Sequence, residues 1–179
     1  MQSTRWLLRD VVERSGLVYA DECGGISQIS VEVIARRLGA GLQSQPLDLA
    51  TQEIALPAYF GPPVIVVNKF SHPGMRALAI RHGLAHLVAG ELEAGEGSDL
   101  RFMSNVLDHM TLEERRADLF ALADLLPDWQ LDALTASGAG PAVVERELRR
   151  HVTALAPEWP LQRIRDRSRL RLTLYQEGR

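Results

Sequence analysis

The sequence contains a single cysteine, Cys23, among 179 residues. One cysteine cannot form a disulfide within the chain, which is typical of proteins in a reducing compartment. No apolar run approaches the roughly 18 residues that a membrane-spanning helix needs. The first residues carry Arg5 and Arg9 without the apolar segment of a signal peptide. These absences predict a cytoplasmic protein that does not associate with a membrane.

Lysine is also scarce, because Lys69 is the only one and arginine supplies the remaining positive charge. The net charge of −3 excludes no class of partner, but the charge is unevenly distributed. Residues 141–179 carry nine arginines against five acidic residues, so the C-terminal part is basic. Hydrophobic residues make up 46% of the chain, an ordinary share for a globular protein of one domain with a small appendage.

Hydrophobic periodicity and turn residues predict a chain of mixed helices and strands. Three short strands, at 41–47, 53–60 and 64–68, precede a helix that opens at His72-Pro73-Gly74 and is apolar all round. This order predicts an α+β fold in which a small three-stranded sheet packs on that buried helix. We expect a first domain at 1–127 and a helical C-terminal segment at 128–179. The other expected helices span residues 4–15, 31–38, 112–126, 129–134, 142–155 and 161–175.

Two histidines, His82 and His86, stand four residues apart on the expected buried helix. This spacing places them on one helix face, as in sites where two imidazoles bind one zinc ion. In the zinc-protease signature a glutamate follows the first histidine, whereas this chain has Gly83 there. Two histidines at this spacing also occur by chance as ordinary core residues, so the pair alone leaves both interpretations open.

A second helix offers carboxylates that would complete a metal site. Thr111 and Glu114 form the pattern of a capping box, which predicts that the helix starts there. Glu114 could supply a third ligand, and Asp118, one turn later on the same face, could accept the N–H of a ligand histidine. The same residues also fit an ordinary solvated helix face, and Glu113 is an alternative ligand if the register differs by one residue.

These segments together resemble the ImmA/IrrE family of metallo-endopeptidases. The resemblance covers about residues 30–127, with a Val-Val-Asn strand at 66–68, the HxxxH helix, and the block ExxADxFA from Glu114, which ends in Leu-Leu-Pro at 125–127. It implies a zincin-like fold with His82, His86 and Glu114 at the zinc-ligand positions, and Asp118 behind them. It also implies cleavage of helix-turn-helix repressors, which activates mobile elements or stress-response genes.

The chain departs from the family pattern at Gly83, where the family has its catalytic glutamate. A positioned general base contributes about 10²–10⁴ in rate, and glycine has no side chain to act as one. We therefore expect a zinc-binding pseudoenzyme with weak or no peptidase activity. A mid-helix glycine also costs about 1 kcal/mol relative to alanine. That cost hints at crowding or at a space kept open, although drift after loss of activity explains it equally well.

Other titratable side chains could enter the space beside Gly83. Glu53 lies on an expected strand, and Glu91 and Glu93 follow the end of the helix. None of these glutamates has a spacing that singles it out as a replacement base. His72 and His109 are the remaining candidates near the two helices, and we expect His109 to be a loop residue.

The basic C-terminal helix suggests a different function. Arginines alternate along residues 161–175, and Arg163 and Arg167 are candidate contacts to nucleic-acid phosphates. However, spacing by two spreads charge around a helix, so we favour an exposed amphipathic helix with its leucines and isoleucine turned inward. The last two helices resemble a helix-turn-helix remnant, which does not by itself establish DNA binding. The alternative function is thus a non-catalytic regulatory or DNA-binding module.

Overall fold

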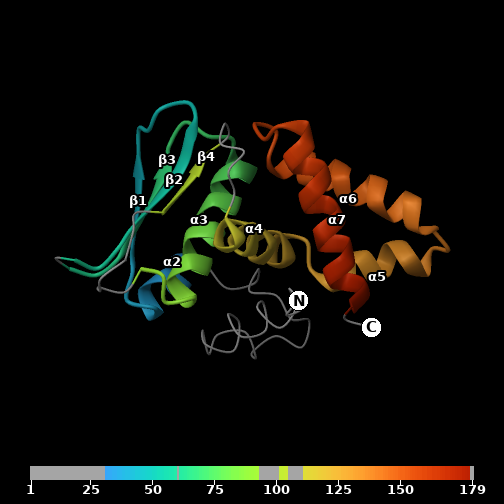
Figure 1. The fold of residues 1–179 in the computed structure, drawn as a ribbon, viewed down its shortest axis with the longest axis horizontal. Coiled ribbons are helices and arrows are strands. Elements are labelled where there is room, and N and C mark those ends of the chain that lie inside the picture. Colours follow the sequence, from blue (N-terminus) through green and yellow to red (C-terminus); the bar gives the residue numbers. More distant parts are fainter. Residues whose placement is uncertain (1–30, 60, 93–100, 105–110, 178–179) are drawn as a thin grey trace.

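The computed structural model describes residues 31–59, 61–92, 101–104 and 111–177 (Figure 1). The helix expected at 4–15 and His109 lie outside these residues. The described chain has an α+β fold, with a mixed four-stranded sheet packed on helices and a helical C-terminal part. Its elements are α2 Val31–Arg37, β1 Gly41–Gln45, β2 Thr51–Leu56, β3 Val64–Asn68, α3 Pro73–Val88, β4 Arg101–Ser104, α4 Leu112–Leu125, α5 Asp128–Ala136, α6 Pro141–Leu155 and α7 Leu161–Glu177.

The sheet has the strand order β1-β3-β2-β4, with β1 parallel to β3 and β2 antiparallel to both of its neighbours. The strand expected at 64–68 is β3, and β2 ends at Leu56, because the following Pro57 has no N–H to donate to a partner strand. The prediction of three strands is wrong, since β4 adds a fourth. This strand has only four residues, and it is stabilised by pairing with β2, which lies far earlier in the chain.

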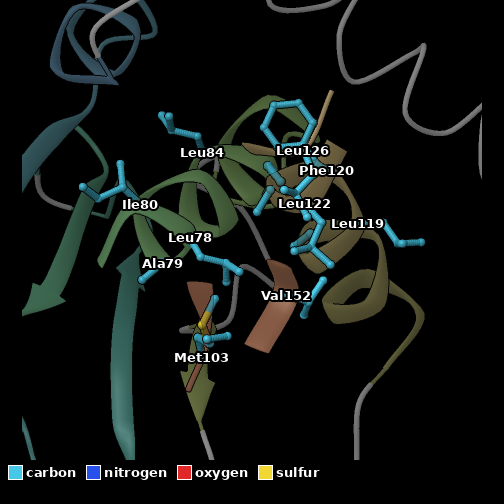
Figure 2. Packing of buried hydrophobic residues seen from close by; sticks show 14 of the residues in the cluster. Leu78, Ala79, Ile80, Leu84, Met103, Leu119, Phe120, Leu122, Leu126 and Val152 are labelled. Atoms are coloured by element: carbon cyan, nitrogen blue, oxygen red, sulfur yellow. The ribbon is translucent and has the colours of Figure 1, made fainter. Parts of the chain in front are cut away.

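Helix α3 lies between the sheet and α4 and is buried along most of its length (Figure 1). Its start is set by His72, whose Nδ1 accepts a hydrogen bond of 3.1 Å from the Gly74 N–H, and by Pro73 in the first turn. Leu78 and Leu84 are fully buried, and Figure 2 shows them in a cluster with side chains of α4, β4 and α6. Burial of each such leucine contributes about 1.5–3 kcal/mol, which holds the predicted buried helix rigidly in place.

Helix α4 begins and ends as its capping residues predict. The Thr111 hydroxyl accepts a hydrogen bond of 3.3 Å from the Glu114 N–H, and the helix stops at Leu125, shortly before Pro127. A full capping box would turn the Glu114 side chain back to the Thr111 backbone. Instead, this side chain extends toward the histidines of α3. The cap therefore fixes the backbone of α4 while Glu114 serves the site described below.

Two of the C-terminal helices, α6 and α7, pack directly on the two central helices (Figure 1). Helix α7 lies against α4 and α6, and α6 also contacts α3. The approach to α3 is close at Gly74, where an added Cβ would lie 2.7 Å from the Leu155 carbonyl oxygen. Among the described residues, no helix combines the length and apolarity needed to cross a bilayer.

Candidate metal centre

The structure brings His82, His86 and Glu114 together between α3 and α4. Each offers one ligand atom, and these atoms all lie within 4.8 Å of one another. The Nε2 atom of His82 is 3.1 Å from Oε2 of Glu114, and that of His86 is 3.4 Å from Oε1. Both histidines are buried, whereas the Glu114 side chain remains 15% exposed. The predicted set of two imidazoles and a carboxylate thus forms one group that solvent can reach from the glutamate side.

Each histidine also contacts a carboxylate of its own at Nδ1, the ring nitrogen that does not face Glu114. Nδ1 of His82 lies 2.9 Å from Oε2 of Glu53 on β2, and Nδ1 of His86 lies 2.6 Å from Oε2 of Glu91, just past the end of α3. Glu91 in turn forms an ion pair with Arg116. A carboxylate at Nδ1 accepts its proton, which leaves the Nε2 lone pair free to bind a cation.

The donor set fits a divalent metal ion. Within the described part of the chain, the buried Nε2 atoms of His82 and His86 make no hydrogen bond, although both face Glu114. Two lone pairs and a carboxylate that face one another in a buried space repel unless a cation lies between them. Two histidines and one glutamate form a ligand set of catalytic zinc sites, which keep a fourth position open. These three residues could therefore hold a zinc ion.

The pKa values of His82 and Glu114 show the same demand for positive charge, whereas that of His86 does not. Burial opposes the charge on His82, but the carboxylates of Glu114 and Glu53 outweigh it and raise the pKa of His82 to about 10. Burial also lowers the pKa of His86, against the opposing effect of Glu114. Burial would raise the pKa of Glu114, yet the two histidine rings that face its carboxylate hold this pKa far below its usual range. The carboxylates around His82 thus favour a positive charge at this position.

Asp118 lies beside this group but has different partners from those expected of it. Its Oδ1 is 3.7 Å from Nε2 of His82, while its carboxylate accepts hydrogen bonds from Arg163 at 2.9 Å and from Arg167 at 2.6 Å. Although burial would raise it, these two guanidinium groups hold the pKa of Asp118 below its usual value. The N–H groups of the two histidines go to Glu53 and Glu91 instead. Glu113, the alternative ligand, is not part of the metal-binding group found among the described residues.

Arg163 and Arg167, which the sequence offers as nucleic-acid contacts, point into the protein. They are 9% and 3% exposed, and Arg163 also donates to the Ser104 carbonyl oxygen at 2.6 Å and lies 4.2 Å from the Trp159 ring centroid. Together with Arg171, they recur every four residues and form one buried face of α7. The spacing by two along the whole helix hid this spacing by four. Side chains held in this way are not available to a phosphate backbone.

The apolar side chains of α7 are placed as expected. Ile164 and Leu174 are buried, and Leu170 and Leu172 are partly buried against the core. The inward face of α7 thus combines aliphatic residues with arginines that are neutralised by partners on other elements.

The space beside Gly83 is filled by Glu53. A Cβ added at Gly83 would lie 2.8 Å from Oε1 of Glu53 and 2.8 Å from Cγ2 of Ile65. Of the other candidates for this space, Glu91 binds His86, His72 caps α3 at the surface, and Glu93 lies outside the described residues. One signal in the sequence could have singled out Glu53, because it is the charged residue that directly precedes the apolar run at 54–56.

Comparisons with protein-family models, with curated proteins and with solved structures found no match to this chain. The family resemblance is therefore carried by the motifs of the sequence alone. The geometry of the candidate metal centre, in contrast, follows from this chain's own residues and their contacts.

Proposed function

We propose that this protein is a zinc-binding regulator of the ImmA/IrrE type, with weak or no peptidase activity. The observation that carries the proposal is the convergence of both Nε2 atoms on Glu114, while each Nδ1 is held by a further carboxylate. Such carboxylate–histidine pairs orient metal ligands and increase their basicity. A buried histidine pair that served only packing would not need a carboxylate at every ring nitrogen.

A bound zinc ion would lower the pKa of a water molecule and polarise a peptide carbonyl. The residues of this chain supply the ligands, and the partly exposed Glu114 side chain leaves access to the site. Gly83 supplies no general base, and Glu53 is held at the Nδ1 side of His82. The loss of a positioned base reduces the rate of peptide hydrolysis by about 10²–10⁴. We therefore expect the protein to bind its target and to cleave it slowly or not at all.

The partner that the resemblance implies is a helix-turn-helix repressor, which would be bound and cut slowly or not at all. This would place the protein in transcription regulation, for instance in a stress response. The alternative, direct DNA binding, would depend on exposed arginines such as Arg150 and Arg165, because Arg163 and Arg167 are buried.

The metal content of the purified full-length chain tests this proposal. We expect about one zinc ion per chain, and we expect loss of that ion in His86→Ala and in Glu114→Ala. His151→Ala is a matched control, because this partly buried histidine lies on α6 and outside the group. A wild-type protein that contains no zinc and takes up none from solution would overturn the proposal.

A second experiment addresses the partner. The zinc-loaded protein is mixed with a repressor encoded beside its gene, and complex formation and cleavage are followed together. A stable complex with little cleavage fits the proposal. Salt-sensitive DNA binding that is lost in Arg150→Gln/Arg165→Gln, without any repressor complex, would favour the alternative.

A further inference from the structure

Glu53 is an unusual residue for the middle of a sheet. It lies on β2 opposite Val67 of β3 and Met103 of β4, and its exposed fraction is 0%. Its Oε2 receives the hydrogen bond of His82, whereas Oε1 is buried and, among the described residues, has no hydrogen-bond partner. A carboxylate in such a place is costly unless its charge serves another group. Within the described ranges, the one side chain that bonds to Glu53 is His82, a candidate zinc ligand.

Gly83 is the reason that this carboxylate can reach His82. The 2.8 Å that separates an added Cβ from Oε1 of Glu53 is shorter than a van der Waals contact allows. Both Glu53 and Ile65 are fully buried, but the end of the Glu53 side chain has more rotatable bonds than the branched Ile65, which lies at the same distance, so Glu53 yields more easily. Even alanine, the best helix former, would therefore displace the carboxylate.

We propose that Gly83 and Glu53 are a matched pair, in which the glycine admits the Glu53 carboxylate that positions His82 as a metal ligand. The inference rests on the proposed metal centre and adds a role for two residues outside the ligand set. The helix has lost the carboxylate of the zinc-protease signature, and a strand carboxylate occupies the adjoining space. Glu53 engages Nδ1, so it is a positioning residue and not a substitute for the missing base.

Simple drift after loss of activity does not account for this arrangement. A drifting position in a buried helix would accept alanine, which is about 1 kcal/mol more favourable than glycine in a helix interior. Here the space that a side chain would need is taken by a charged group from β2 together with Ile65 of β3. The close approach of Glu53 therefore gives a physical reason for the glycine, and Glu53 in turn bonds to His82, a candidate metal ligand.

A double-mutant cycle tests the pairing on the full chain. Zinc affinity is measured by competition with a chromophoric chelator for wild type, Gly83→Ala, Glu53→Ala and the double variant. Loss of the partner of a ligand histidine lowers metal affinity by about 10–100-fold, and we expect this loss in both single variants. The factor lost on Gly83→Ala should be clearly smaller in the Glu53→Ala background than in wild type, because the glycine acts through Glu53. The contact with Ile65 is present in both alanine-83 proteins and cancels in the cycle.

Two further variants separate positioning from packing. Glu53→Gln keeps an oxygen that can accept the Nδ1 proton, so it should bind zinc more tightly than Glu53→Ala. Gln52→Ala is the matched control, since Gln52 is an equally buried neighbour on β2 that bonds to Leu49 and Ser71. It should leave zinc affinity unchanged. The absorption spectrum of bound cobalt(II) should change in Glu53→Ala and be retained in Gln52→Ala.

The outcomes distinguish this inference from the proposed function. If wild type binds no zinc, both are overturned. If wild type binds zinc but Gly83→Ala lowers zinc affinity by the same factor with and without Glu53, only the pairing is overturned. The same holds if Glu53→Ala binds zinc as tightly as wild type. If Gly83→Ala does not fold, equal zinc affinities of Glu53→Gln and Glu53→Ala would overturn the positioning role, and tighter binding by Glu53→Gln would support it.

Discussion

The Asp118 carboxylate on α4 accepts a hydrogen bond of 2.9 Å from the Arg163 guanidinium on α7. Arg167 donates to the same carboxylate at 2.6 Å, and all three side chains are buried. This contact ties the basic C-terminal helix to the helix that carries Glu114. Buried ion pairs thereby join the C-terminal segment to α4 at Asp118, four residues after the candidate ligand Glu114.

Asp118→Ala should strongly destabilise the protein. The substitution leaves two buried guanidinium groups without this partner, and breaking such a buried pair costs about 3–5 kcal/mol. The free energy of unfolding in urea measures the loss. Arg169→Gln is the control, because its ion pair with Glu145 is exposed and contributes at most about 1 kcal/mol. Equal effects of the two substitutions would contradict the role of the buried contact.

Glu114→Gln should abolish stoichiometric zinc binding, whereas Glu113→Gln should not. The two residues are adjacent, but only Glu114 faces both histidines. Elemental analysis of the two purified variants decides between them. Retention of zinc by Glu114→Gln with loss in Glu113→Gln would mean that the ligand helix is shifted by one residue.

Glu91→Ala should lower zinc affinity by about 10–100-fold, because it removes the acceptor of the Nδ1 proton of His86. Glu158→Ala serves as the control, since Glu158 is an exposed residue that accepts from the His72 backbone, away from the group. Chelator competition gives both affinities. Identical values for the two variants would show that Glu91 has no part in holding the ligand.

Zinc affinity should rise with pH. With a pKa of about 10, the His82 ring is protonated on both nitrogens throughout the neutral range when no metal is bound. A metal ion that binds Nε2 must displace the proton there. Release of one proton raises the apparent affinity by about tenfold per pH unit between roughly pH 7 and 9. Titrations in several buffers test this, and an affinity that is flat over the range would be inconsistent with proton displacement.

Restoring the signature by Gly83→Glu should not restore a peptidase. The new side chain meets Glu53 and Ile65, and overpacking of this kind costs about 1–3 kcal/mol. We expect a lower melting temperature and no gain in repressor cleavage, with partial recovery of stability in Gly83→Glu/Glu53→Ala. A single Gly83→Glu variant as stable as wild type would show that the space is not limiting.

Several features could be predicted from local patterns in the sequence. The capping residues Thr111 and His72-Pro73 mark the starts of α4 and α3, and the run of β-branched residues at 64–67 gives β3. The spacing of His82 and His86 places two imidazoles on one helix face. These are properties of segments a few residues long, in which the backbone conformation alone decides what lies next to what.

The tertiary structure decided the rest, because it depends on residues brought together from distant parts of the chain. Strand β4 forms only by pairing with β2, and Arg163 and Arg167 turn inward only because Asp118 lies beneath them. The same holds for Glu53, which reaches His82 across the packing of a strand on a helix. The sequence by itself determined that two histidines and a glutamate could meet, whereas folding decided that carboxylates from other parts of the chain hold both rings and that Gly83 leaves room for one of them.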